Sequence, residues 1–320
     1  MGFIQHSIPP LYCCRTFGEK FSNTFDFITA NWRVLLCMLT IVLLPLCAVQ
    51  AINVNGLVSS VYSDLDVGGD IAGKVMGFVL NYCALLVFGI ISTAVLVSVV
   101  YAVMKLYHEQ NADGTAAHPE LGSMTFVQLR PLMMRQLRAA FKAIGAIILV
   151  SVVLMAVIMA AVVPLALASM SGTLVIAVLV AYVVALVVLV PMTLALPVYS
   201  FEDIGFFSGI RKTLVYGFKT WRGIVALMFV MWLLVSVVLG VLGMPWIIAF
   251  MLKTMFISGD IAELGFTSSV WFSFLQYLCG VVYVYTSYMG YAVVLVALAY
   301  QYGHAREKID GEEFGSDINF

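Results

Sequence analysis

Two adjacent carboxylates, Glu202 and Asp203, are the residues best suited to acid–base chemistry, and they end a long apolar stretch. A pair of carboxyl groups can supply the general acid and the general base of a hydrolytic reaction. An amphipathic segment follows them, and negative charge near the start of a helix is stabilised by the positive end of the helix dipole. We therefore interpret the pair as part of the cap or first turn of that helix rather than as a catalytic site.

Thiols and imidazoles are the other groups that could act as nucleophiles or metal ligands. Of the six cysteines, four lie inside apolar runs, where a free thiol behaves as a small apolar side chain. Cys13 and Cys14 are adjacent and lack the spaced partners that a zinc site requires. The four scattered histidines are His6, His108, His118 and His304. The chain also has no glycine-rich phosphate-binding motif. We therefore predict no catalytic, cofactor-binding or metal-binding residues, no cofactor and no enzymatic activity.

The composition favours lipid as the solvent, because 63% of the 320 residues are hydrophobic and only 10% are charged. Soluble domains contain roughly 45–50% apolar and about 25% charged residues. The formal net charge of −1 creates no basic field that would attract nucleic acid. The expected fold is an all-α, polytopic transmembrane helix bundle in contact with the lipid bilayer, with no nucleic-acid partner.

Long uncharged intervals mark the helices that must position any polar group. The interval between Arg33 and Asp64 has 30 residues, and the interval between Lys142 and Glu202 has 59. A span needs about 20 residues, so the longer interval must turn, and the small polar cluster 169–173 is where we expect it to do so. We place six spans near 34–52, 76–101, 143–168, 174–197, 223–243 and 272–299.

The uncharged interval between Arg222 and Lys253, which holds the fifth predicted span, is longer than one span, and Pro245 interrupts it. Proline lacks a backbone N–H and disfavours a straight helix. The segment 244–257 is then either part of a kinked fifth span or a separate re-entrant or interfacial segment, and both alternatives stay open here.

Lysine and arginine are distributed unevenly between the two sides of the predicted spans, with 14 on one side and two on the other. Positive charge accumulates in cytoplasmic loops, so we predict that both termini are cytoplasmic. The outer loop with Asp64, Asp66 and Asp70 is acidic. We expect a cytoplasmic arm with an amphipathic helix at 1–33, a six-span membrane domain at 34–300 and a short, acidic, disordered tail at 301–320.

A weak internal repeat precedes the odd-numbered spans. Amphipathic stretches at 21–32 and 207–221 each end in a Trp-Arg pair, and a third stretch, expected to begin its helix at Pro131, ends in Phe141-Lys142. This pattern predicts three units, each with one surface helix and two spans. Independent placement of aromatic and basic residues at the membrane surface is the alternative.

Two segments resemble parts of known membrane proteins. Phe17–Ile28 (FGEKFSNTFDFI), continued by Asn31-Trp32-Arg33, resembles the opening of a group of uncharacterised bacterial six-span integral membrane proteins. Pro197–Asp203 (PVYSFED) is distantly similar to a segment of the membrane domain attached to glycerophosphodiester phosphodiesterases. The resemblance implies a six-span protein of the bacterial cytoplasmic (inner) membrane. It implies no activity, because the chain has neither a phosphodiesterase domain nor a His-Arg-Gly motif.

The predicted spans contain no ionisable Asp, Glu, Lys, Arg or His, which argues against a proton relay or a charged selectivity ring. Their milder polar residues include Asn81, Gln276 and Tyr288, which either bond neighbouring helices together or line a polar path. We expect a non-catalytic membrane component that acts through the bilayer or through a partner, either another membrane protein or a second copy of the chain. An uncoupled channel or facilitator for a small solute is the alternative.

Overall fold

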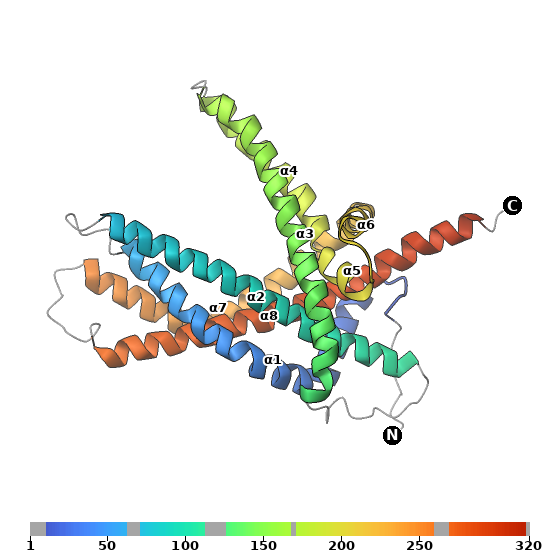
Figure 1. The fold of residues 1–320 in the computed structure, drawn as a ribbon, viewed down its shortest axis with the longest axis horizontal. Helices are drawn as coiled ribbons and strands as arrows, with labels where there is room; N and C mark the ends of the chain where they lie inside the picture. The colour runs from blue at the N-terminus through green and yellow to red at the C-terminus, as the bar shows by residue number, and fades with distance from the viewer. Residues whose placement is uncertain (1–10, 63–70, 113–125, 168–170, 259–268, 318–320) are drawn as a thin grey trace. The chain divides into compact units, whose positions relative to one another are not determined.

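A computed structural model describes residues 11–62, 71–112, 126–167, 171–258 and 269–317. Every regular element in these ranges is a helix (Figure 1). The helices are α1 (Phe17–Tyr62), α2 (Ile71–Ala112), α3 (Phe126–Leu167), α4 (Ser171–Met192), α5 (Ala195–Phe201), α6 (Phe206–Lys219), α7 (Trp221–Ser258) and α8 (Val270–Asp317).

Six stretches of these helices are long and apolar enough to cross a membrane, which confirms the predicted all-α class. They lie in α1, α2, α3, α4 with α5, α7 and α8. Helix is the form expected of such segments, because a helix satisfies its own backbone hydrogen bonds where no water can do so.

The amphipathic stretches are helical as predicted, but two of them are not separate helices. The stretch 21–32 lies near the start of α1 and continues without a break into the first apolar segment. Helix α3 begins at Phe126, before the predicted start at Pro131, and also continues into its apolar segment. Of the three stretches, only 207–221 gives a separate helix, since α6 ends at Lys219 and Thr220 divides it from α7.

Helix α7 runs through Pro245, so of the two alternatives for 244–257 the structure shows a continuation of the fifth apolar helix rather than a separate segment. Proline is tolerated inside apolar helices where neighbouring groups satisfy the freed backbone carbonyl. The predicted disorder of the tail is wrong as far as Asp317, where α8 ends. Ile309 is buried there, and the Arg306–Asp310 ion pair joins consecutive turns of the helix. The acidic outer loop with Asp64, Asp66 and Asp70 lies outside the described residues, as does part of the turn predicted at 169–173.

The chain divides into two compact units. Unit 1 comprises Met1–Val34, Val97–Val230 and Val294–Phe320, and unit 2 comprises Leu35–Leu96 and Met231–Val293. Helices α1, α2, α7 and α8 contribute one segment to each unit, whereas α3, α4, α5 and α6 belong wholly to unit 1.

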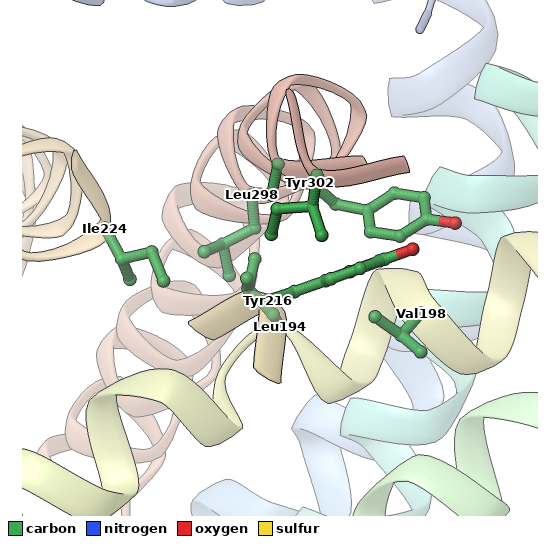
Figure 2. Close-up of a cluster of buried hydrophobic side chains, with 8 residues drawn as sticks. Leu194, Val198, Tyr216, Ile224, Leu298 and Tyr302 are labelled. Carbon is green, nitrogen blue, oxygen red and sulfur yellow. The ribbon is translucent and has the colours of Figure 1, made fainter. Parts of the chain in front are cut away.

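The core of unit 1 gathers side chains from α5, α6, α7 and α8 (Figure 2). Tyr216 and Tyr302 lie close together in it, with their ring centroids 6.2 Å apart. Helix α3 packs against α4, α5 and α6, and Figure 1 shows α3 and α4 running side by side. Glycine allows α6 to approach its neighbours closely, because a methyl group at Gly217 would lie 2.7 Å from the Cα atom of Pro191.

The core of unit 2 combines aromatic stacking with small residues. The indole of Trp246 stacks on Tyr283, with ring centroids 5.0 Å apart. Gly280 leaves room for that indole, since a methyl group there would lie 3.3 Å from Nε1 of Trp246. Small residues at helix contacts let backbones approach where lipid supplies no hydrophobic driving force.

Candidate functional site

A buried carboxylate, Glu202, is the centre of a charged cluster in unit 1. Glu202 is the residue that caps the C-terminal end of α5, and its side chain is only 9% exposed. Its Oε1 accepts a hydrogen bond of 2.6 Å from the hydroxyl of Tyr302, which is fully buried. Its Oε2 lies 2.7 Å from Nζ of Lys212. Both carboxylate oxygens are therefore engaged by side chains of other helices, α8 and α6.

The cluster extends along α8 to a second carboxylate. Nε of Arg306 lies 4.0 Å from Oε1 of Glu202 and 3.6 Å from Oδ2 of Asp310. The hydroxyl of Tyr216 donates a 2.7 Å hydrogen bond to Oδ1 of Asp310. The pKa of Tyr216 is raised above its usual value, mainly by burial and secondly by this hydrogen bond. The hydroxyl therefore keeps its proton and remains a donor. We call these side chains the Glu202 cluster: Glu202, Lys212, Tyr216, Tyr302, Arg306 and Asp310.

The Glu202 cluster is suited to joining helices rather than to catalysis. Two carboxylates face two cations, and a buried charge needs such compensation to be tolerated. Each oxygen of Glu202 already interacts with a side chain of a neighbouring helix, Oε1 with Tyr302 and Oε2 with Lys212. The cluster therefore ties the end of α5 and the middle of α6 to the last turns of α8.

This arrangement corrects the interpretation of Glu202 and Asp203 as a helix cap. The residue at the N-terminal cap of α6 is Gly205, and no side chain bonds to the cap there. Asp203 is exposed and lies 3.7 Å from Arg135 of α3. The pairing of Glu202 with Tyr302 cannot be read from the sequence, because the two residues are 100 positions apart.

Two pockets of unit 1 are lined by several cations. The first, of about 300 Å³, contains Glu202 and Asp203 in its wall together with the cations Lys105, Arg135, Arg138 and Lys142. The second, of about 540 Å³, is formed by the N-terminal part of α1, the connection between α6 and α7, and the C-terminal part of α8. Among the described residues that line the second pocket, none is acidic.

The apolar segments of unit 2 contain a polar cluster of their own, formed by Gln50 of α1, Ser92 of α2 and Tyr288 of α8. Nε2 of Gln50 donates to the hydroxyl of Tyr288 at 2.9 Å and to Oγ of Ser92 at 3.2 Å. The hydroxyl of Tyr288 donates in turn to Oε1 of Gln50 at 3.0 Å. All three side chains are buried, so this cluster joins three helices through hydrogen bonds.

The residues named from the sequence are not all brought together. Tyr288 meets Gln50, a polar residue in the middle of an uncharged interval and the functional group that sequence reasoning missed. Nδ2 of Asn81 donates to the carbonyl of Gly77 one turn earlier. Asn81 precedes Ser92 by 11 positions on α2, about 16 Å along the helix axis, so it lies outside the cluster. Gln276 is buried.

The cysteines and histidines of the described residues do not assemble a metal site, since the described part of the chain has no group of three His, Cys, Asp or Glu that could hold an ion. All six cysteines are free thiols. Nδ1 of His304 accepts a 3.0 Å hydrogen bond from the backbone N–H of Arg15, and the ring of His108 lies edge-on to Tyr300. His6 and His118 lie outside the described residues.

The fold defines an all-helical protein with six helices apolar enough to cross a membrane. Comparison with protein-family models, with curated proteins and with solved structures finds no match to this chain.

Proposed function

We propose that the chain is a non-catalytic, multi-pass component of the bacterial cytoplasmic membrane that acts through the bilayer or through a partner membrane protein. The distribution of lysine and arginine supports cytoplasmic termini. The likeness to bacterial six-span proteins supports the choice of membrane.

The exposure of α3 and α4 carries this proposal. Only 6% of the apolar stretch of α3 and 11% of that of α4 is buried, compared with 39% in α1, α2 and α8. Large apolar side chains such as Val157 and Leu179 are more than 60% exposed. An apolar surface of this extent is stable only against lipid tails or against the apolar surface of another membrane protein.

Spin labels at Val157→Cys and Leu179→Cys in a cysteine-free chain test the proposal in lipid nanodiscs. We expect the labels to be accessible to oxygen and protected from a water-soluble nickel reagent, as lipid-facing positions are. A second copy on this surface would shield the labels from both reagents and broaden their spectra by label–label coupling. A label at Glu307→Cys, which is exposed near the end of α8, supplies the water-accessible control. Nickel accessibility at 157 and 179 equal to that of the control would refute the proposal.

An uncoupled facilitator for a small solute is the second candidate function, and the polar cluster of Gln50, Ser92 and Tyr288 favours it. Amides and hydroxyls within apolar segments can line a path for neutral solutes. Liposomes that contain the protein should then take up glycerol faster than empty liposomes, and Tyr288→Phe should change that rate. In both candidate functions an imposed pH gradient should drive no proton uptake, because the predicted spans contain no Asp, Glu, Lys, Arg or His. Equal glycerol uptake with and without the protein would eliminate the facilitator.

A further inference from the structure

The second basic pocket has the composition of an anion-binding site. Four cations line it, and they come from four parts of the chain: Lys20 from α1, Lys219 from the end of α6, Arg222 from the start of α7 and Lys308 from α8. Like charges gathered in one cavity repel one another, and among the described residues that line the pocket no carboxylate offsets that repulsion. A bound anion would offset it.

Buried polar groups in the same wall lack partners. Gln301 is fully buried, and neither its amide nitrogen nor its amide oxygen has a hydrogen-bond partner. Nε1 of Trp221 is also a buried donor without a partner. Leaving such groups unpaired is costly, and native proteins pair them with protein, water or ligand. The pocket therefore combines positive charge with donors that a ligand could satisfy.

Two neighbours complete the wall around Gln301. Gly223 keeps the space beside the amide open, because a methyl group there would lie 3.2 Å from Nε2 of Gln301. His304 receives the N–H of Arg15 on its Nδ1. Its neutral ring then carries its proton on Nε2, which adds a further donor to the wall.

We propose that this pocket binds a ligand with two phosphate groups, such as the headgroup of an anionic phospholipid that carries two phosphodiester groups. Phosphate oxygens accept charge-assisted bonds from both lysine and arginine. Four cations exceed what one phosphate would neutralise, and about 540 Å³ provides room for a second. Basic pockets between membrane helices on the cytoplasmic side bind such headgroups. The inference rests on the proposed function for its ligand source, since Trp221 and Arg222 stand where the chain is predicted to enter the membrane.

Ligand titrations of the purified full-length protein in detergent test the proposal, read out by melting temperature and by native mass spectrometry. The probes are diphosphatidylglycerol, phosphatidylglycerol, phosphatidylcholine and inorganic pyrophosphate. We expect diphosphatidylglycerol to bind at a concentration about tenfold lower than phosphatidylcholine. Binding of pyrophosphate but not of the lipids would retain the two-phosphate chemistry and assign it to a soluble ligand. If no probe binds better than phosphatidylcholine, the proposal fails.

Two double variants distinguish binding in the pocket from general electrostatic attraction to the protein. Arg222→Gln with Lys308→Gln removes two charges from the pocket and should weaken diphosphatidylglycerol binding by roughly tenfold to thirtyfold. Arg130→Gln with Arg211→Gln removes two charges from exposed positions outside it and should change binding less than about twofold. Equal losses in the two variants would refute a specific site.

Gln301→Leu tests whether Gln301 contributes to ligand binding rather than to the stability of the fold. Replacing an unpaired buried amide by an apolar side chain of similar size should leave the melting temperature without ligand unchanged or raise it. The melting-temperature increase produced by diphosphatidylglycerol should at the same time fall by more than half. A variant that retains the full increase would contradict the assignment of Gln301 to the site. These measurements in detergent are independent of the spin-label accessibilities, so a failure here is distinguishable from a failure of the proposed function.

Discussion

Glu202 depends on groups from distant parts of the chain to remain charged in a nearly enclosed position. Its closest partners are the hydroxyl of Tyr302 at 2.6 Å and Nζ of Lys212 at 2.7 Å. The tyrosine is fully buried, so its hydrogen bond is shielded from competing water. This bond should therefore contribute more to stability than a bond at the protein surface.

Tyr302→Phe should lower the stability of unit 1. It removes one donor from a buried carboxylate, and a hydrogen bond to a charged group contributes about 1.5–3 kcal/mol. Thermal unfolding in detergent measures the loss. Tyr182→Phe removes the same hydroxyl from a side chain of α4 that is 64% exposed and should leave the melting temperature unchanged. Equal melting temperatures for the two variants would contradict the role assigned to the Glu202 cluster.

For the Gln50–Tyr288 pair in unit 2 we expect that a second substitution restores stability lost by the first. Tyr288→Phe should cost about 0.6–1.7 kcal/mol, the range found for hydrogen bonds between membrane helices. Adding Gln50→Leu removes the amide oxygen that is left without its donor, but it also removes the bond to Ser92, so the double variant should recover part of the lost melting temperature. Tyr291→Phe, at a position that is 53% exposed, is the control. A double variant less stable than Tyr288→Phe alone would contradict the predicted recovery and show that the bond to Ser92 contributes more than the unpaired oxygen costs.

Among the elements, α6 is held against α4 by a glycine. Gly217→Ala would place a methyl group 2.7 Å from the Cα atom of Pro191, a backbone atom that cannot move aside cheaply. We expect a loss of about 1–3 kcal/mol, the cost of overpacking a close contact. Gly240→Ala, in α7, has no atom within 4 Å of the new methyl group and should be neutral or stabilising, since alanine favours helix. Melting temperatures of the two variants in detergent test the contrast, which would disappear if α6 were free to shift.

A neighbouring face of α6, about a quarter turn from Gly217, presents aromatic side chains, with Phe207 76% and Phe218 48% exposed. The sequence predicts that this face lies at the cytoplasmic membrane surface. Phe207→Asp and Phe218→Asp should then release α6 and lower the melting temperature in detergent, because burying such a side chain contributes about 1.5–3 kcal/mol. Ser208→Asp introduces the same charge at a neighbouring exposed position and is the control. Unchanged protease resistance of the phenylalanine variants in nanodiscs would contradict a membrane-bound face.

At the scale of the whole molecule, the asymmetry of basic residues predicts the orientation. In a cysteine-free chain, Asp66→Cys should react with a membrane-impermeant maleimide in intact cells. Glu307→Cys should react only after the membrane is permeabilised. Labelling of position 66 only after permeabilisation would reverse the topology.

The sequence by itself determined the helical class and the six apolar helices. Both follow from local properties: an uncharged interval of 30 residues is long enough for a helix to cross the membrane, and a helix satisfies its own backbone hydrogen bonds in lipid. The amphipathic helix at 207–221 was also predictable, because Phe207, Leu214 and Phe218 share one face of an isolated helix. The continuity of α7 through Pro245 was less certain, since proline permits either outcome.

Only the tertiary structure decided which polar groups meet. Glu202 and Tyr302 are separated by 100 positions, and the second basic pocket draws its cations from four parts of the chain. The pairing of Gln50 with Tyr288 and the helical tail around Ile309 also depend on contacts between distant segments. A side chain's local pattern records its polarity and its face on a helix. Its partner depends on how helices pack, which local periodicity does not encode.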